Sequence, residues 1–164
     1  MTREGSSTAI RVAGEADLGA LADLRALWTA GASADPGFRR RMAAWLAGDG
    51  ERRTTWLATV SDRPAGMASL FEYRRMPKPG QSDSRWGYIG NLYVRDDCRL
   101  RGLGSALLTA VIATADERSY ARLVVSPSAE ALSLFRRHGF VGPGEAIGDA
   151  SLLVRPFAHH DRAR

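Results

Sequence analysis

The fold of this chain is decided by the stretch Ile89-Gly90-Asn91-Leu92-Tyr93-Val94-Arg95-Asp96-Asp97-Cys98-Arg99-Leu100-Arg101-Gly102-Leu103-Gly104. Its first part belongs to an apolar run, residues 86–94, that has the length and composition of a strand. After the glycines, apolar residues recur every three or four positions as far as about Arg118, which predicts a helix with one buried face. The stretch therefore predicts a strand, a short turn and a helix in succession.

The turn between this strand and this helix, residues 99–105, has the composition of an anion site. Gly102 and Gly104 allow the backbone to approach a ligand closely. The first amides of the helix have no acceptor within it, and the helix dipole makes that end partly positive. With Arg99 and Arg101 nearby, these donors favour a phosphate group. Two such glycines also occur in tight turns that bind nothing, and neither the nucleotide-hydrolase loop nor the dinucleotide fingerprint is present.

The remaining sequence alternates predicted strands and helices. Strands are expected at residues 8–12, 54–60, 65–73, 86–94 and 122–125, with two late ones near 140–141 and 151–155. Helices are expected from Asp17 to Gly31, after the pair 35–36 up to Gly48, at 102–118, and at 128–138 with Gly139 as its stop. Inward-facing residues of the first two helices are expected to be Leu21, Leu24, Trp28, Phe38, Met42 and Trp45. The stretch 74–85, rich in proline and glycine, is expected to be a surface loop.

Length and composition fit one globular domain. The chain has 164 residues and is 45% hydrophobic, which suffices for a core without disulfides or a structural metal. We expect residues 8–157 to form this domain and residues 1–7 and 158–164 to be flexible ends. No run approaches the roughly 18–20 apolar residues that span a bilayer, and none has signal-peptide character. We therefore expect a cytoplasmic protein with no membrane partner.

The charge balance favours an anionic partner. The formal net charge is +5, and Lys78 is the only lysine among 23 basic residues; guanidinium groups pair well with phosphate. The arginines are scattered through every segment and no recognition helix is evident, so we expect a phosphorylated cofactor and no nucleic acid. Cys98, the only cysteine, fits an apolar filler. The adjacent pair His159-His160 is a poor metal site, and no metal is expected.

Together, the flanking motifs make the pattern specific. The stretch 89–104 resembles the acyl-CoA motif of the GNAT superfamily of N-acetyltransferases, in which Arg/Gln-x-x-Gly-x-Gly/Ala opens a helix. Downstream, the next family segment is similar at the same spacing to Leu123-Val124-Val125, Ser128, Ala131, Leu134-Phe135 and Gly139-Phe140. The close match covers residues 86–140. The resemblance implies an α/β single-domain GNAT-like fold, with a mixed central sheet of about six or seven strands, about four flanking helices, and splayed strands 4 and 5.

The resemblance also implies acetyl-CoA as the acetyl-donor substrate, bound largely by main-chain groups. In the family the fourth strand bulges, pantetheine lies along it like an added strand, and the pyrophosphate rests on the amides of the turn. An amide near Val94 would polarise the thioester carbonyl. The residues expected to bind acetyl-CoA are Leu92, Tyr93, Val94, Arg99, Leu100, Arg101, Gly102, Leu103, Gly104, Ser105, Ser128 and Phe135.

Two positions on the second motif depart from the family pattern. Many relatives have a tyrosine at the position of Phe135, placed to protonate the leaving thiolate. Phenylalanine has no proton to give, so we expect Phe135 to pack against the cofactor or the core. Ser128 replaces a common asparagine near the pantetheine arm and also suits a helix N-cap. His138, beside the helix end, is expected to serve as a cap rather than as a catalyst.

The general base is also missing from its usual place. Many relatives carry a glutamate on the fourth strand, whereas residues 89–91 contain no acid. A base is needed because an alkylammonium is mostly protonated at neutral pH. Glu72 on the neighbouring predicted strand is the first candidate, against the alternative of a solvated strand-edge carboxylate, and Asp83 is the second. Tyr73 and Tyr88 are candidates for positioning the substrate.

The sequence thus predicts transfer of an acetyl group from acetyl-CoA to a primary amine of a small molecule or peptide by direct attack. The alternative is a non-catalytic acyl-CoA-binding regulatory or sensor module, which the loss of both usual proton-handling residues favours. The amine acceptor, the length of the acyl group and the oligomeric state stay open, and a homodimer fits because dimers are common among relatives.

Overall fold

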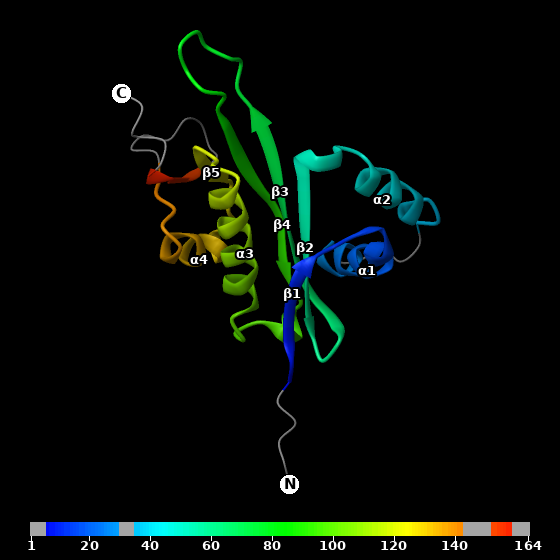
Figure 1. Ribbon diagram of the computed structural model, residues 1–164. Coiled ribbons are helices and arrows are strands. Elements are labelled where there is room, and N and C mark those ends of the chain that lie inside the picture. The colour runs from blue at the N-terminus through cyan, green and yellow to red at the C-terminus, as the bar shows by residue number, and fades with distance from the viewer. Residues whose placement is uncertain (1–5, 30–34, 143–151, 159–164) are drawn as a thin grey trace. The chain divides into compact units, whose positions relative to one another are not determined.

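The computed structural model describes residues 6–29, 35–142 and 152–158, which form six strands and four α-helices (Figure 1). The strands are β1 (Thr8–Val12), β2 (Arg53–Val60), β3 (Arg63–Arg74), β4 (Arg85–Val94), β5 (Arg122–Val125) and β6 (Leu153–Pro156). The helices are α1 (Leu18–Trp28), α2 (Phe38–Ala47), α3 (Leu103–Glu117) and α4 (Leu132–Arg137). This order confirms the expected succession of elements with one exception: the strand expected near residues 140–141 is wrong, because Val141 forms only an isolated bridge to Val154. Gly31 and Ser151, expected as element boundaries, and the pair His159-His160 lie outside the described residues.

The strands form one mixed sheet in the order β1-β2-β3-β4-β5-β6. β1 is antiparallel to β2, and β5 is antiparallel to β6. β4 runs parallel to β5 from the pair Gly87 and Leu123 to the pair Ile89 and Val125. β5 ends at Val125, whereas β4 continues to Val94. The mixed sheet with its parallel pair and four helices confirms the predicted fold class. No helix within the described ranges is long and apolar enough to cross a membrane.

The chain divides into two compact units. The first consists of residues 1–69 and 91–107, and the second of residues 70–90 and 108–164. The first contains β1, β2, α1 and α2, and the second contains β5, β6 and α4. β3, β4 and α3 each begin in one unit and end in the other. The single domain expected over residues 8–157 stays a prediction.

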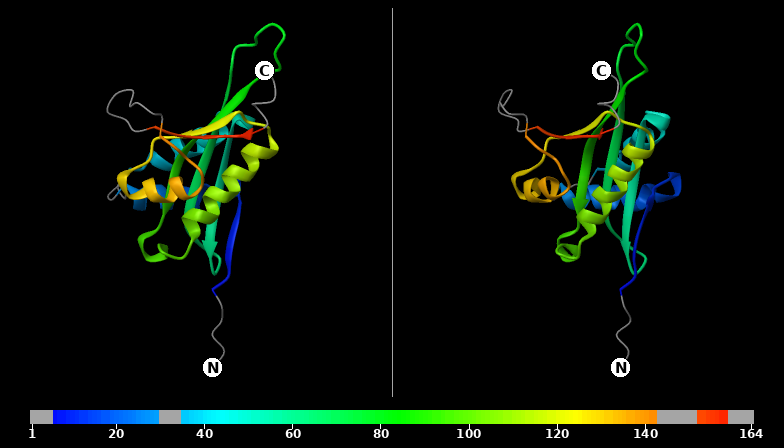
Figure 2. Two further views of the ribbon diagram at one scale, coloured as in Figure 1. Left: turned by 90° about the vertical axis from the view of Figure 1, so that its left-hand side faces the viewer. Right: turned by 60° about the vertical axis from the view of Figure 1, so that its left-hand side comes forward.

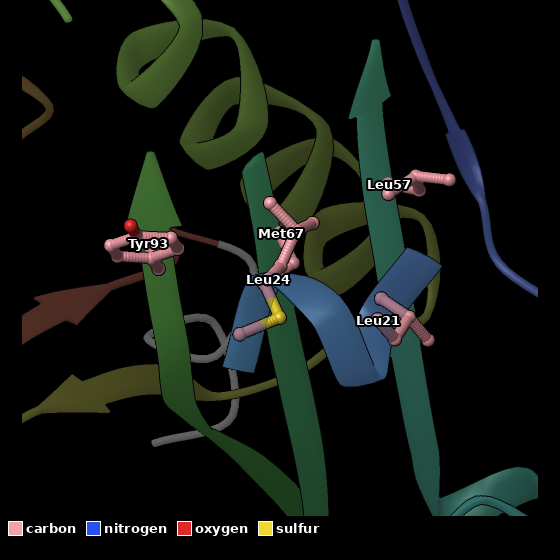
Figure 3. Packing of buried hydrophobic residues seen from close by; sticks show 5 residues of the cluster. All are labelled: Leu21, Leu24, Leu57, Met67 and Tyr93. Atoms are coloured by element: carbon pink, nitrogen blue, oxygen red, sulfur yellow. The ribbon is translucent and has the colours of Figure 1, made fainter. Parts of the chain in front are cut away.

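The core of the first unit is a cluster of buried side chains from α1 and three strands. Figure 3 shows where these side chains lie on α1, β2, β3 and β4; they are Leu21, Leu24, Leu57, Met67 and Tyr93. Met42 and Leu46 of α2 pack against the cluster, as the helical spacing predicted for Met42. Trp28 lies on the inward face, as expected, since its ring stacks on the Tyr93 ring of the cluster at 5.5 Å. It is nevertheless 39% exposed, because it lies in the last turn of α1, at the edge of the cluster.

The core of the second unit lies between the α3 stripe and the sheet residues of that unit. Leu108, Val111 and Ala115 follow one another at three- and four-residue spacing and are fully buried. Gly87 of β4 lies in this core, where an added Cβ would come within 2.6 Å of Leu70. The close packing explains why a glycine occupies the middle of a strand.

Two hairpins connect β2, β3 and β4. Between β2 and β3, Ser61 and Asp62 have φ values of 47° and 62°, the backbone of a two-residue type I′ turn. Between β3 and β4, the Tyr73 ring stacks on Trp86 at 4.6 Å. The loop 75–84, expected at the surface, extends past these two strands as a hairpin tip (Figures 1 and 2). At that tip the Gln81 N–H donates to the Lys78 carbonyl and Gly80 has a φ of 74°, which is a Pro-Gly type II turn.

Candidate functional site

Asn91, in the middle of β4, has a left-handed backbone. Its φ is 55°, and asparagine is among the few non-glycine residues that adopt this conformation. In β4, Gly87 contacts Leu70, whereas Tyr93 packs with Met67. Leu70 and Met67 lie an odd number of residues apart and therefore face opposite sides of β3. Gly87 and Tyr93 lie an even number of residues apart and would face the same side of β4 if that strand were regular. β4 therefore changes face between them, and Asn91 marks a bulge in the strand where the family resemblance implies one.

The turn after β4 is open to solvent. It passes through a 3₁₀ turn, Asp96–Cys98, and reaches α3 through two residues with left-handed backbones, Leu100 with a φ of 62° and Gly102 with a φ of 77°. Leu103 is buried and anchors the start of α3, whereas residues 99–102 are exposed. A Cβ added to Gly102 would meet no atom within 4 Å. The turn thus presents its backbone to open space.

The N-terminus of α3 presents hydrogen-bond donors beside this turn. The hydrogen bond from the Ala106 N–H to the Gly102 carbonyl, 3.0 Å, is the one with which the helical ladder starts. The amides of Leu103 and Gly104 precede the ladder and have no acceptor within the helix. Because the dipole of α3 adds partial positive charge at the same end, this geometry suits an anion.

The two arginines of the turn have different roles. Arg99 is held in place, since Nη2 lies 3.0 Å from Asp96 Oδ1 and Nε donates to the Val94 carbonyl at 3.3 Å. Arg101 is exposed, and its guanidinium pairs with no carboxylate of the described residues. Arg99 therefore ties the turn to the end of β4, while Arg101 carries a positive charge at the surface.

The predicted pantetheine-binding strand contains Leu92, Tyr93 and Val94. Leu92 and Val94 are half-buried. The Tyr93 ring lies in the hydrophobic cluster of the first unit and stacks on Trp28. Tyr93 could therefore contact a ligand through its main-chain groups but not through its side chain.

Two predicted acetyl-CoA residues lie in the second unit. Ser128 is exposed and occupies the N-cap position of the 3₁₀ turn Ala129–Ala131, but its side chain makes no capping hydrogen bond. The hydroxyl cap that we expected is therefore not formed. Phe135 is 2% exposed and lies edge-on to Phe140, with ring centroids 5.2 Å apart. The Phe135 ring thus packs in the core of its unit.

Glu72, the first candidate for the base, is buried and fully engaged. Its carboxylate accepts hydrogen bonds from Tyr120 Oη at 2.8 Å and Arg74 Nε at 2.9 Å, and lies 3.6 Å from Arg85. Burial alone would raise the pKa of Glu72, but the two hydrogen bonds and the charge of Arg85 together lower it below its ordinary value. The alternative of a solvated strand-edge carboxylate is wrong, because Glu72 is only 8% exposed. These contacts suit a structural ion-pair cluster.

A row of polar side chains that the sequence analysis missed crosses three strands of the first unit. Thr55 of β2 and Ser69 of β3 share a hydrogen bond of 3.0 Å, and Asn91 Nδ2 donates to Ser69 Oγ at 3.4 Å. Ser69 is fully buried, and buried hydroxyls are normally hydrogen-bonded. The row holds the Asn91 amide group at the bulge, with its Oδ1 unpartnered among the described residues. Its only signal in the sequence was a polar residue in each of three apolar strands.

The other predicted candidates are dispersed. Asp83 is exposed on the β3–β4 loop, and Tyr73 is 48% exposed at the base of that loop. Tyr88 is half-buried in the paired part of β4. His138 lies at the C-cap of α4, and its Nδ1 is 2.9 Å from a carbonyl of that helix, so the expected capping position is confirmed.

Comparison with known proteins places this geometry in a family. Residues 20–140 match the model of the acetyltransferase (GNAT) family. No curated protein sequence matches the chain significantly.

Three similar solved structures share the fold. A GCN5-related N-acetyltransferase from Ralstonia eutropha JMP134 is 26% identical, with a TM-score of 0.65 over 85% of this chain and 96% of that one. A predicted acetyltransferase with acetyl-CoA from Clostridium acetobutylicum is 20% identical, with a TM-score of 0.67 over 86% and 94%. Glucosamine-6-phosphate N-acetyltransferase from Arabidopsis thaliana is 14% identical, with a TM-score of 0.70 over 87% and 97%.

The family match extends over most of the chain. It includes the bulged strand, the open turn, α3 and α4, and it ends at the Gly139-Phe140 pair. The mixed sheet and the open turn at the start of α3 agree with this assignment. The chain therefore belongs to the GNAT family of acetyltransferases.

Proposed function

We propose that this protein transfers the acetyl group of acetyl-CoA to a primary amine of a small molecule or peptide. The observation that carries the proposal is the open turn at the start of α3, where Gly102 leaves the backbone uncovered beside an exposed arginine. Family membership supports it, and so does the similar structure from Clostridium acetobutylicum, which is described with acetyl-CoA.

In this proposal, the pyrophosphate of acetyl-CoA binds the first amides of α3, and Arg101 adds charge beside it. The pantetheine arm follows the main chain of residues 92–94, past the bulge at Asn91. A bulge is a place where a strand stops pairing regularly, so it supports an added ligand strand. Ser128 and Phe135 remain predicted contacts on the grounds of the family resemblance.

The chemistry needs two proton transfers. The amine nitrogen attacks the thioester carbonyl carbon, the C–S bond breaks, and the thiolate of CoA takes up a proton while the amine loses one. Protonation of Glu72 would weaken its charged contacts with Arg74 and Arg85, so these contacts favour a structural role. Asn91 Oδ1 is not basic, but it can accept a hydrogen bond from the amine and orient it. We propose that Asn91 positions the amine and that water carries its proton away.

The donor site is tested by Gly102→Asp. The substitution places a negative charge where the pyrophosphate is proposed to bind, and we expect acetyl-CoA affinity to fall at least tenfold, since charged hydrogen bonds contribute roughly 1.5–3 kcal/mol. Gly80→Asp is the matched control, because both glycines have a left-handed backbone and open space around the Cβ position. Calorimetric titration of the folded variants measures both affinities. Equal affinities for the two variants would contradict the site.

A non-catalytic acyl-CoA sensor is the second candidate. Two observations favour it: the carboxylate of Glu72 is hydrogen-bonded to Tyr120 and Arg74, and the buried Phe135 ring has no hydroxyl that could donate a proton. Release of free thiol from acetyl-CoA over a panel of amines separates the candidates. Tight binding of acetyl-CoA without thiol release for any amine would favour the sensor.

A further inference from the structure

A pocket of about 200 Å³ lies in the first unit, between the β2–β3 hairpin and the turn after β4. Its lining residues are Val60, Ser61, Arg63, Pro64, Arg95, Asp97, Cys98 and Arg101. Since a water molecule occupies about 30 Å³ in the liquid, the pocket can hold a phosphate-sized group together with several waters. Only Arg101 among these residues belongs to the proposed acetyl-CoA site, so the pocket is a separate feature next to it.

The charges that line the pocket are unbalanced. Three are positive, from Arg63, Arg95 and Arg101, and one is negative, from Asp97. Arg95 and Asp97 neutralise each other through two hydrogen bonds of 3.0 and 2.6 Å. Neither Arg63 nor Arg101 has an ion pair with any carboxylate in the described part of the chain. The pocket therefore has an excess of two guanidinium groups.

The walls of the pocket are fixed by main-chain contacts. The Arg95 N–H donates to the Ala65 carbonyl at 2.8 Å, and Arg95 Nη1 donates to the Pro64 carbonyl at 3.2 Å. The type I′ turn at Ser61 and Asp62 fixes the direction of the hairpin. These contacts hold the turn that carries Arg101 against the hairpin that carries Arg63, so the backbone on both sides of the pocket needs little ordering when a ligand binds.

We propose that this pocket binds a phosphate monoester, whose dianion accepts paired hydrogen bonds from Arg63 and Arg101. The inference rests on the proposed function, because acetyl-CoA carries one phosphate monoester, on its ribose, and Arg101 connects the pocket with the proposed pyrophosphate site. The same chemistry would also bind free phosphate. The pocket thus selects ligands by the terminal phosphate, in addition to the pyrophosphate bound at α3.

The test compares CoA, 3′-dephospho-CoA and inorganic phosphate at constant ionic strength by calorimetric titration. Three proteins are used: the wild type, Arg63→Gln, and Arg40→Gln as a matched control that removes an exposed arginine of α2 far along the chain from the pocket residues. We expect CoA to bind the wild type roughly tenfold or more tightly than dephospho-CoA. Arg63→Gln removes most of that difference, whereas Arg40→Gln keeps it.

The outcomes separate the two sources and the two proposals. One outcome is that CoA and dephospho-CoA bind equally tightly, while inorganic phosphate binds the wild type and not Arg63→Gln. This outcome supports the pocket, with free phosphate as its ligand. The pocket proposal is overturned if Arg63→Gln and Arg40→Gln behave alike with all three ligands. Absence of binding by both CoA and dephospho-CoA contradicts the proposed function instead, and the phosphate titration then still decides the pocket.

Discussion

At the scale of single residues, the Glu72 carboxylate shows how a polar group can be buried at low cost. Tyr120 is fully buried, and its hydroxyl donates to Glu72. Burial raises the pKa of Tyr120, and the hydrogen bond to Glu72 raises it further. The donor therefore stays protonated and the acceptor stays charged over the whole neutral range. The arginines on the exposed side supply the remaining partners.

The structural role of Glu72 predicts the behaviour of Glu72→Gln. The variant should lose about 1–3 kcal/mol of unfolding free energy at neutral pH, because charged hydrogen bonds become neutral ones. A carboxyl with a lowered folded pKa stabilises the protein above its unfolded pKa, 4.5, and the stabilisation disappears as pH falls through the folded value. The difference from wild type in urea unfolding should therefore shrink below about pH 4.5.

The same variant separates the structural role from that of a general base. If Glu72 is structural, the pH profile of kcat keeps its shape in Glu72→Gln, whereas loss of a base removes the limb that reports its ionisation. Glu51→Gln, at an exposed position, should change neither stability nor the pH profile. A kcat that collapses while unfolding free energy stays unchanged would reinstate Glu72 as the base.

At the scale of elements, local pattern was a good guide wherever local physics decides the structure. The six strands of the sheet, the helical stripe of α3 and the stop at Gly139 were predicted from periodicity and backbone preference, whereas the strand expected near residues 140–141 is only a bridge. The buried partner of Glu72 could not be predicted, since Tyr120 is 48 residues away and a hydrogen bond across the fold leaves no local trace. Trp28 is more exposed than its helical spacing predicted, because a helical period does not show where the core ends.

In the candidate site, too, the features that depend on local sequence could be predicted and those that depend on strand register could not. The open turn before α3 depends on glycine and on helix geometry, so residues 99–105 could be singled out from the sequence. The exact bulge position, Asn91, depends on which residue shifts the strand to its other face. The row of Thr55, Ser69 and Asn91 depends on the register of three strands, which no short motif encodes.

The C-terminal end of α4 has a cap that depends on Gly139. The Phe140 N–H donates to the Phe135 carbonyl, the Gly139 N–H donates to the Arg136 carbonyl, and the two phenylalanine rings touch, which together form a Schellman motif. Gly139 has a φ of 85°, so Gly139→Ala should cost roughly 1–2 kcal/mol. Gly14→Ala, at a φ of −122° with open space around it, should change stability by less than about 0.5 kcal/mol. Chemical unfolding of both variants measures the contrast, and similar losses would contradict it.

At the scale of the whole molecule, the question is whether the two compact units are one domain. β3, β4 and α3 each cross from one unit to the other. If one unit unfolded alone, each of these elements would be cut in its middle and would lose the hydrogen bonds of its broken ladder or helix turn. Unfolding of one unit alone would therefore break three elements, and each break costs free energy. The shared elements therefore favour a single cooperative unit, which agrees with the domain expected over residues 8–157.

The three shared elements predict one unfolding transition, and the tryptophans can report it. Trp28, Trp45 and Trp56 lie in the first unit and Trp86 in the second, so in Trp86→Phe the fluorescence reports the first unit alone while far-ultraviolet circular dichroism reports both. In a two-state protein the two signals change together. We expect coincident urea curves in the variant, and saturating acetyl-CoA should move both to higher urea by the same amount, because a ligand of the native state stabilises the whole cooperative unit. If the fluorescence and circular dichroism curves separate, or if acetyl-CoA shifts only one of them, the units unfold independently. The single-domain prediction is then wrong.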